Sequence, residues 1–376
     1  MSGACDSCLR RGYLIGHLAG SIARLLDYPR RQAPGLLALP EADLIAAVAG
    51  DGAADARRFL RSFDPAAARQ SLRSASVHAV CLHAAAYPRP LRSLHDPPAV
   101  LFAAGSLREL GCLEFEPAAV ALVGTRNPSP YGVEIAYELG RGLAAAGVTV
   151  VSGLALGIDA AAHRGCVDAG GPAVAVLAGG PDVPYPRTNR RLYDRIRTVG
   201  VVVSELPPGQ RAYRWSFPAR NRIMAGLASI TVVVEAADPS GSLITSVFAG
   251  DLGRTVAAVP GRGTSRYSAG SNKLLADGAR MITCAQDLLD ELGGVGWEGR
   301  ARGTEAASAA HDAVHVRDEL HERVLDALEA GLGIDGVCAS SGLPAREARA
   351  LLARLEASGR LRRDGLGGYR RAAGFR

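Results

Sequence analysis

The stretch Val120-Ala-Leu-Val-Gly-Thr-Arg126, followed by Asn127-Pro-Ser-Pro-Tyr-Gly132, decides how the middle of this 376-residue chain folds. Four apolar residues end in Gly-Thr-Arg, turn residues follow, and a helical pattern covers residues 133–146. This order predicts a buried parallel strand that leads into a helix through a tight loop. Such a loop presents free N–H groups and the positive end of a helix dipole to a phosphate, and Arg126 adds a permanently charged donor fork.

The same order of strand, loop and helix repeats through the centre of the chain. Strands are expected at residues 120–123, 148–151, 173–177, 201–203, 230–234, 255–259 and 281–283, and helices at 133–146, 158–169, 188–198, 218–227, 242–252 and 271–277. The alternation predicts an α/β fold, a Rossmann-like doubly wound and mostly parallel sheet with helices on both faces. Ligands of such sheets bind outside the carboxyl ends of the strands, where the strand order reverses.

Both ends of the chain are predicted to be additions to this sheet. A small N-terminal helical module is predicted for residues 1–75. The Rossmann-like domain with the phosphate-binding loop is predicted for residues 76–292, and the chain enters it through short strands near 77–83 and 100–102. The Gly-, Ala- and Ser-rich composition of residues 293–313 predicts a linker. Residues 314–376 predict three helices followed by a hairpin over 360–371, which is the order of a winged helix.

Composition and targeting signals limit the class of protein. No signal peptide is visible, and no apolar run reaches the ~18–20 residues that span a bilayer, so a cytoplasmic protein without membrane contact is expected. Seven scattered cysteines do not predict a disulfide framework. Cys5 and Cys8 form a lone Cys-x-x-Cys, and because no second Cys or His pair is apparent nearby, no metal site is expected.

The kind of positive charge is more informative than its amount. The net charge of +6 is too evenly spread to predict nucleic-acid binding by itself. Lys273 is the single lysine among 43 basic residues. A GC-rich genome explains the excess of arginine, and under that bias the one remaining lysine marks a position that needs a compact ammonium. Gly270-Ser-Asn-Lys273 lies at a predicted helix start, and this favours a phosphate contact for Lys273.

Nearly every predicted central strand ends in a polar or glycine-rich turn. Ser152-Gly153 follows one strand, Ser240-Gly-Ser242 opens a helix after another, and Pro260-Gly261 follows a third. If these turns share one rim of the sheet, their N–H groups, hydroxyls and helix N-termini line a concave anion site. For any single turn, the simpler explanation is that small residues let a helix pack tightly against the sheet.

The segment Phe217-Pro-Ala-Arg-Asn-Arg222 adds two arginines to the same rim. Arg220 and Arg222 are two residues apart and cannot share a helical face. One is therefore expected to point into the cleft while the other forms an internal ion pair with Glu235 or Asp159. Phe217 is placed to stack on a base, or else it is an ordinary core side chain.

Signals for catalysis are weak. The Gly-x-x-x-x-Gly-Lys-[Ser/Thr] loop of nucleotide hydrolases is absent, and residues 124–132 do not form Gly-x-Gly-x-x-Gly, so no dinucleotide or other cofactor is expected. Asp159 and His163 are one helical turn apart, but such a pair at a helix start is more often a cap with an internal hydrogen bond than an acid–base pair. No catalytic residue and no metal ligand is assigned, and the protein is expected not to be an enzyme.

Taken together, the motifs resemble the DNA-processing protein A family (DprA, also called Smf). The resemblance covers about 200 residues and is most specific in Ser152-Gly-Leu-Ala-Leu-Gly-Ile-Asp-Ala-Ala-Ala-His163. It extends over Tyr87-Pro, Asp96-Pro-Pro, Gly124-Thr-Arg126, Tyr185-Pro, Ser204-Glu, Phe217–Arg222, Glu235-Ala, Ser240-Gly-Ser-Leu-Ile-Thr245, Val259-Pro-Gly261, Gly270-Ser-Asn and Asp277-Gly-Ala279. Thr125 and Ala228 stand where the family often has serine.

The resemblance implies a protein that binds single-stranded DNA through its phosphates, without sequence preference and without cutting it. It further implies a homodimer formed through the Rossmann-like domain, which protects the strand and delivers it to the RecA recombinase in natural transformation. The implied DNA- or phosphate-binding residues are Gly124, Thr125, Arg126, Ser152, Gly153, Phe217, Arg220, Asn221, Arg222, Ser240, Gly241, Ser242 and Lys273.

Two other interpretations stay open. A Rossmann-like protein that binds or hydrolyses a nucleotide would use the same phosphate loops, with Asp159 or Glu235 assisting cleavage. Alternatively, the winged helix binds duplex DNA and the protein is a regulator, because residues 342–371 hold eight arginines against three acids, with Arg346 and Arg349 on one helix. A winged helix that packs against protein is the plainer explanation of that domain.

Overall fold

The computed structural model describes residues 3–26, 34–107 and 119–294, together with shorter stretches between residues 324 and 371. The chain divides into two compact units, Met1–Ala301 and Arg302–Arg376. The division falls within the stretch predicted to be a linker, residues 293–313, of which 295–313 lie outside the described residues.

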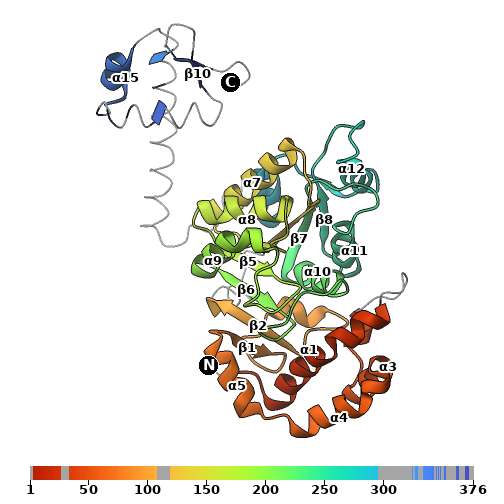
Figure 1. Cartoon of the computed structure of the whole chain (residues 1–376). Helices are drawn as coiled ribbons and strands as arrows, with labels where there is room; N and C mark the ends of the chain where they lie inside the picture. The colour runs from red at the N-terminus through yellow and green to blue at the C-terminus, as the bar shows by residue number, and fades with distance from the viewer. Residues whose placement is uncertain are drawn as a thin grey trace. The chain divides into compact units, whose positions relative to one another are not determined.

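The first unit is built on one nine-stranded sheet (Figure 1), whose strand order is β1-β2-β6-β5-β4-β3-β7-β8-β9. In the spatial order from β6 through β5, β4, β3, β7 and β8 to β9, all neighbouring strands are parallel. In contrast, β2 is antiparallel to both β1 and β6. This confirms the predicted mostly parallel sheet. The strands are β1 (His78–Cys81), β2 (Val100–Gly105), β3 (Ala119–Val123), β4 (Val150–Ser152), β5 (Ala173–Val176), β6 (Val201–Ser204), β7 (Ala228–Val233), β8 (Thr255–Ala258) and β9 (Arg280–Met281).

The strand order reverses at β3. From β3 the chain adds β4, β5 and β6 on one side, and it then returns to place β7 directly on the other side of β3. In the pairing, Val120 lies beside Val150 of β4 and Ile230 of β7. The loops that leave the carboxyl ends of β3 and β7 therefore flank the switch point, where doubly wound sheets bind ligands.

Helices cover both faces because the strands alternate the direction of their apolar side chains. Val120 and Leu122 of β3 pack under one helical layer, whereas Ala121 and Val123 pack under the other. The first layer contains α7 (Pro130–Ala145), α8 (Ile158–Asp168), α9 (Arg190–Val199) and α13 (Ala285–Gly293). The second contains α1 (Asp6–Leu26), α5 (Pro65–Ser74), α10 (Ser216–Leu227), α11 (Leu243–Asp251) and α12 (Ala269–Ala276).

The predicted helices of the sheet begin within a few residues of the expected positions, and one further helix was not expected. Helix α7 begins three residues before the expected position, because Ser129 caps it by accepting a hydrogen bond from Gly132 N at 3.1 Å and Pro130 occupies the first turn. Helix α13 was not predicted at all. It is started by a capping box in which the Asp287 carboxylate accepts hydrogen bonds from the backbone of Thr283 and Cys284.

The N-terminal helices belong to the same compact unit as the sheet. Besides α1 and α5 they are α2 (Pro34–Leu37), α3 (Glu41–Val48) and α4 (Ala53–Ser62). Gly12 of α1 approaches β2 so closely that a Cβ there would lie 3.0 Å from Phe102 Cζ. Trp215 is buried against α1, and its indole N–H donates to Ala19 O at 3.0 Å. The boundary predicted at residue 75 therefore does not divide two compact units.

The second unit contains α15 (Ile334–Ser341) and an antiparallel hairpin of β10 (Leu361–Arg363) and β11 (Tyr369–Arg371). Val324, Val337, Leu352 and Leu361 form its small core. The short helix and the hairpin agree with the predicted winged helix. Most residues of the other two helices predicted in this domain lie outside the described part of the chain.

Within the described residues, no helix combines the length and the apolar character that crossing a membrane requires.

Candidate nucleic-acid interface

The loop after β3 is held tightly on both sides. Thr125 N donates to Glu235 O at 2.7 Å, and Thr125 O accepts from Ile158 N at 3.2 Å. A Cβ at Gly124 would lie 2.6 Å from Ile158 Cγ1 and 2.8 Å from Glu235 O, so only glycine fits between β7 and α8. These contacts fix the loop and leave Arg126 exposed at its tip.

Glu235, directly beyond β7, completes this arrangement. Its buried carboxylate accepts from Ser129 N at 2.8 Å and from Ser129 Oγ at 2.6 Å. Of the two acids predicted to pair with Arg220 or Arg222, Glu235 pairs with neither, because its carboxylate holds the start of α7. The other, Asp159, lies 3.6 Å from Arg220, which confirms that alternative. Because both carboxylate oxygens of Glu235 are engaged, Glu235 also does not have the free carboxylate that the nucleotide-hydrolase interpretation required.

A cation and two aromatic rings gather beside this loop. The Arg126 guanidinium carbon lies 5.0 Å from the centre of the Phe217 ring, a cation–π distance. The Tyr185 ring packs against the same ring, with centroids 5.6 Å apart and planes tilted by 60°. Arg126 is exposed, Tyr185 is 49 % exposed and Phe217 is half-buried. We call Arg126, Phe217 and Tyr185 the cation–aromatic platform.

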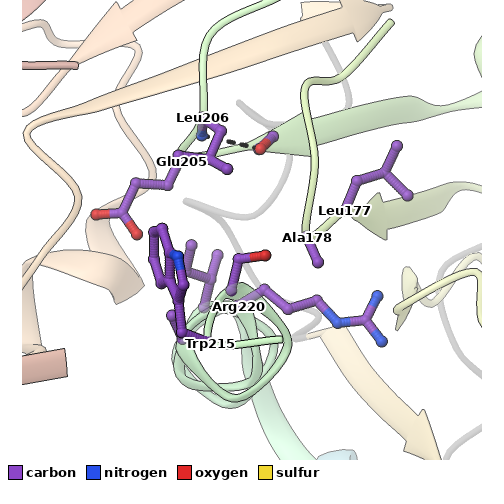
Figure 2. A pocket seen from close by; sticks show the side chains of 10 residues that line it. Leu177, Ala178, Glu205, Leu206, Trp215 and Arg220 are labelled. Atoms are coloured by element: carbon purple, nitrogen blue, oxygen red, sulfur yellow. Dashed lines mark hydrogen bonds between the residues drawn. The ribbon is translucent and has the colours of Figure 1, made fainter. Parts of the chain in front are cut away.

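Arg220 lies under this platform rather than on it. Its guanidinium donates to Gly153 O and, at 2.7 Å, to Val176 O, and it lies 3.6 Å from the Asp159 carboxylate. In Figure 2 its side chain extends from α10 toward Ala178, away from the Glu205 carboxylate. Burial lowers the pKa of Arg220, while Asp159 acts in the opposite direction. Arg220 was predicted to contact DNA, but its hydrogen bonds instead link α10 to the ends of β4 and β5.

Arg222 is buried on the other side of α10. Its Nε and Nη2 each lie 2.9 Å from a carboxylate, of Asp96 and Glu205 respectively, and Nη1 donates to Ala219 O at 3.0 Å. Only 1 % of the residue is exposed. Arg222 therefore cannot contact DNA from the surface, contrary to the prediction. Both arginines are buried because each faces carboxylates on its own side of the helix. The divergence of positions i and i+2 predicted that the two side chains point in different directions, but not that both directions lead to acids.

The small pocket beside Arg220 is not a nucleotide site. It is lined by residues that include Leu177, Ala178, Glu205, Trp215 and Arg220 (Figure 2). Its interior has room for about one water molecule. This pocket therefore has no room for a nucleotide.

Three further predicted residues are supports of the rim. Ser152 is buried and donates its hydroxyl to Leu122 O at 2.6 Å, joining β4 to β3. Gly153 N donates to Asp159 Oδ2 at 3.2 Å. Asn221, 8 % exposed, donates from its side chain to Gly241 O at 3.3 Å. These contacts correct Ser152, Gly153 and Asn221 from ligand contacts to positioning residues.

Other predicted residues are accessible at the rim. Gly241 is exposed, and the hydroxyls of Ser240 and Ser242 lie 2.8 Å apart at the start of α11. Lys273 on α12 is exposed, with its Nζ 3.0 Å from Asp238 Oδ2 in the loop beyond β7. The hydrogen bond to Asp238 raises the pKa of Lys273, so the ammonium stays charged. Arg126 thus lies in the loop after β3, whereas Lys273 lies on the helix after β8 and is paired with the loop beyond β7, the strand beside β3.

Asp159 and His163 are structural. The Asp159 carboxylate accepts from Gly153 N at 3.2 Å and from Ala155 N at 3.3 Å, so it ties the turn before α8 to the helix. The predicted cap is wrong, because the residue that precedes the helix is Gly157 and the helix start has no side-chain cap hydrogen bond. Burial raises the pKa of Asp159. His163 is fully buried, and burial lowers its pKa to about 4, so the imidazole is neutral at physiological pH.

Tyr185 is the rim residue that sequence reasoning missed. It belongs to the Tyr185-Pro motif of the family resemblance, which by itself predicts no role for the ring. Leu156, 44 % exposed, also lies on the turn that leads into α8. The available signal was an aromatic residue in a loop between a predicted strand and helix, where burial alone does not require one.

Two family models and several curated relatives match this chain. The family model described as DNA recombination-mediator protein A matches residues 78–293, and the model described as DprA winged helix domain matches residues 304–365. The putative DNA processing protein DprA of Mycobacterium tuberculosis (strain CDC 1551 / Oshkosh) is 44 % identical over 265 residues, 70 % of this chain and 66 % of that relative. DprA of Bacillus subtilis (strain 168) is 39 % identical over 220 residues, 58 % of this chain and 73 % of the relative.

Two solved structures share the fold. The X-ray structure of DprA from Streptococcus pneumoniae superimposes with a TM-score of 0.60 at 32 % identity, covering 76 % of this chain and 96 % of that one. The Helicobacter pylori structure, described by its single-stranded DNA binding mode, gives 0.51 at 29 % identity and covers 57 % and 95 %. The first family model spans more than half of the sequence. The chain therefore belongs to the DNA recombination-mediator protein A (DprA/Smf) family.

Proposed function

We propose that the carboxyl edge of the sheet binds single-stranded DNA without sequence preference. The observation that carries this proposal is the cation–aromatic platform: an exposed Arg126 held at the switch point beside Phe217 and the half-exposed ring of Tyr185. A charged group next to an aromatic face is the combination that single strands require, because a phosphate and an unpaired base lie close together along the chain.

Each part of the rim has a distinct role in this proposal. Arg126 and Lys273 neutralise phosphates, and the backbone around Thr125 and the turn Ser240-Gly-Ser242 donates hydrogen bonds to phosphate oxygens. Tyr185 and the exposed part of Phe217 stack on bases, which tolerates any sequence because every base has a π-face. Gly124, Ser152, Gly153, Arg220, Asn221 and Arg222 hold these groups in place from below.

The relatives support the same interpretation. The Helicobacter pylori protein is described as binding single-stranded DNA, and the shared family is named for DNA recombination. On this basis we propose that the chain protects single strands and delivers them to the RecA recombinase during DNA uptake. RecA assembly on a pre-coated single strand, followed with and without this protein, tests the delivery step separately from binding.

We also propose a homodimer that forms through the Rossmann-like domain. Ile244 and Val247 on α11 are 40 % and 60 % exposed, and paired apolar residues on one helix provide a surface that a second copy can cover. Sedimentation of the full chain and of Val247→Glu tests this. A monomeric wild-type chain at micromolar concentration would exclude the dimer.

The decisive experiment for function compares four ligands with the full chain: a single-stranded oligonucleotide, the matching duplex, a mononucleotide, and the single strand in high salt. The proposal expects the single strand to bind most tightly and its apparent affinity to fall by a log–log slope of ~0.7 per phosphate contact. Released base or shortened DNA would support the nucleotide-hydrolase alternative. Preference for the duplex that is lost on deleting residues 302–376 would support the regulator alternative.

A further inference from the structure

A group of sulfur and nitrogen atoms lies far along the sheet from the switch point, at the edge strand β1. Cys5 and Cys8 lie at the start of α1, Cys81 ends β1, and His83 follows it. Their ligand atoms, three Sγ and one imidazole nitrogen, all lie within 4.8 Å of one another, a grouping found once among the described residues. The fold thus supplies the second pair whose absence from the sequence argued against a metal.

The distances fit a tetrahedral ion. With Zn–S bonds of about 2.3 Å and Zn–N bonds of about 2.0–2.1 Å, ligand atoms at the corners of a tetrahedron lie roughly 3.5–3.8 Å apart. His83 Nδ1 lies 3.3 Å from Cys8 Sγ and 3.6 Å from Cys5 Sγ. The imidazole nitrogen therefore already points at two sulfurs at nearly the required spacing.

The surroundings hold the four side chains in place. The Leu82 and Ala84 carbonyls, on either side of His83, accept hydrogen bonds from the Arg92 guanidinium at 2.7 and 3.0 Å. Ala4 N donates to Ala79 O at 3.0 Å, which aligns the start of α1 with β1. The Ser7 hydroxyl lies 3.3 Å from Cys5 Sγ and can donate to a thiolate there. Such outer contacts orient the ligands of metal sites.

We propose that Cys5, Cys8, Cys81 and His83 bind one structural Zn²⁺ ion. The sulfur-rich set favours zinc over calcium or magnesium, which take oxygen ligands. Four protein ligands leave no open position, which is the mark of a structural rather than a catalytic zinc site. His83 is exposed and Cys8 and Cys81 are buried, so the ion would enter from the solvent side of the cluster.

The ion would fasten the N-terminal helices to the sheet. Cys8 and His83 are 75 residues apart in the chain, and a bond through zinc closes that loop at the edge of the sheet. This role is independent of the DNA-binding proposal, because the cluster shares no residue with the cation–aromatic platform.

For the test, the full chain is purified with a reductant and without added metal. It is then unfolded, refolded with excess Zn²⁺, and dialysed to remove unbound metal. Zinc is measured by elemental mass spectrometry in wild type, Cys81→Ser, His83→Ala and the control Cys284→Ser. Cys284 is exposed and caps α13, a position where serine serves equally well. We expect about one zinc per chain in wild type and control, and at least tenfold less in the two ligand variants.

A second readout covers the case in which Cys81→Ser does not fold. His83 is exposed, so His83→Ala is expected to keep the wild-type circular dichroism spectrum, and Co²⁺ loading should give the tetrahedral thiolate spectrum in wild type only. The proposal is overturned if refolded wild type retains no stoichiometric zinc, or if folded His83→Ala retains as much as wild type. A Cys5–Cys8 disulfide that persists in the presence of reductant would also overturn it.

Discussion

The loop after β3 and helix α10 lie beside each other at the carboxyl edge of the sheet, yet they use arginine in opposite ways. In the loop, Arg126 is exposed and contacts only the face of Phe217 among the described aromatic rings and acids. In α10, Arg220 and Arg222 are 7 % and 1 % exposed and lie against Asp159, Asp96 and Glu205. The position of nearby acids therefore decides which arginine remains available to a ligand.

The difference has consequences of different kinds. Removing one partner of a buried ion pair leaves an uncompensated charge inside the protein, which destabilises the fold. Removing an exposed cation leaves the fold unchanged and weakens only the binding of an anion. Substitutions in the two regions should therefore separate stability from DNA affinity.

The largest effect is expected for Arg222→Ala, which leaves the carboxylates of Asp96 and Glu205 buried without a cation. We expect a loss of about 3–5 kcal/mol in the free energy of unfolding, measured by urea denaturation. The matched control is Arg57→Ala, an exposed arginine on α4, which should change stability by less than about 0.5 kcal/mol. Equal losses in the two variants would show that Arg222 is not an internal ion-pair residue.

The buried residues also predict that the stability of the fold decreases in acid. Burial, helped by the nearby charge of Arg220, lowers the pKa of His163 to about 4, below the value of about 6.5 for an unfolded chain. Between these values the unfolded state binds more protons, so stability should fall by about 3 kcal/mol as the pH falls from 6.5 to 4. In His163→Gln this part of the pH dependence should disappear. An unchanged pH profile would mean that His163 is protonated in the folded state.

On the exposed side, Tyr185→Ala should weaken binding of a single-stranded oligonucleotide by about 1–3 kcal/mol, the contribution of one stacked base. Stability should stay the same, because the ring is half-exposed. Tyr185→Phe keeps the π-face and should bind as wild type does, measured by fluorescence anisotropy. If Tyr185→Phe is as weak as Tyr185→Ala, the ring does not act by stacking.

The smallest effect is expected at Lys273, since Asp238 already neutralises part of its charge. Lys273→Ala should weaken DNA binding by about two- to threefold and lower the salt slope by at most ~0.7. Asp238→Asn frees the ammonium and should bind slightly more tightly than wild type. Weaker binding by Asp238→Asn would contradict a phosphate contact by Lys273.

Much of the fold could be predicted from the sequence because it depends on local periodicity. Short apolar runs bounded by Gly, Pro and polar residues gave the central strands from β3 to β9, with bounds that differ by a few residues. The helix that begins at Pro130 starts earlier than its apolar period predicts, because Ser129 and Pro130, residues typical of loops, form its cap and first turn. Sequence periodicity determines where elements are but specifies their ends less well.

The candidate site was harder to predict because it depends on contacts between distant residues. The divergence of Arg220 and Arg222 was predicted, but the acids that bury both are supplied by other segments, with Asp96 lying 126 residues from Arg222. In the same way, Cys81 and His83 meet Cys5 and Cys8 only through the pairing of α1 with β1. The position of Arg126 was predictable because the loop that carries it is determined by its own strand, glycine and helix.

The most direct test of the central claim measures the affinity of wild type and Arg126→Ala for a single-stranded oligonucleotide over a range of salt concentrations, with Arg57→Ala as the control. If Arg126 is the exposed phosphate contact, its removal weakens binding about tenfold and lowers the log–log salt slope by ~0.7, while the melting temperature stays unchanged. An Arg126→Ala variant with the wild-type affinity and the wild-type salt slope would contradict the assignment of this rim as the DNA-binding surface.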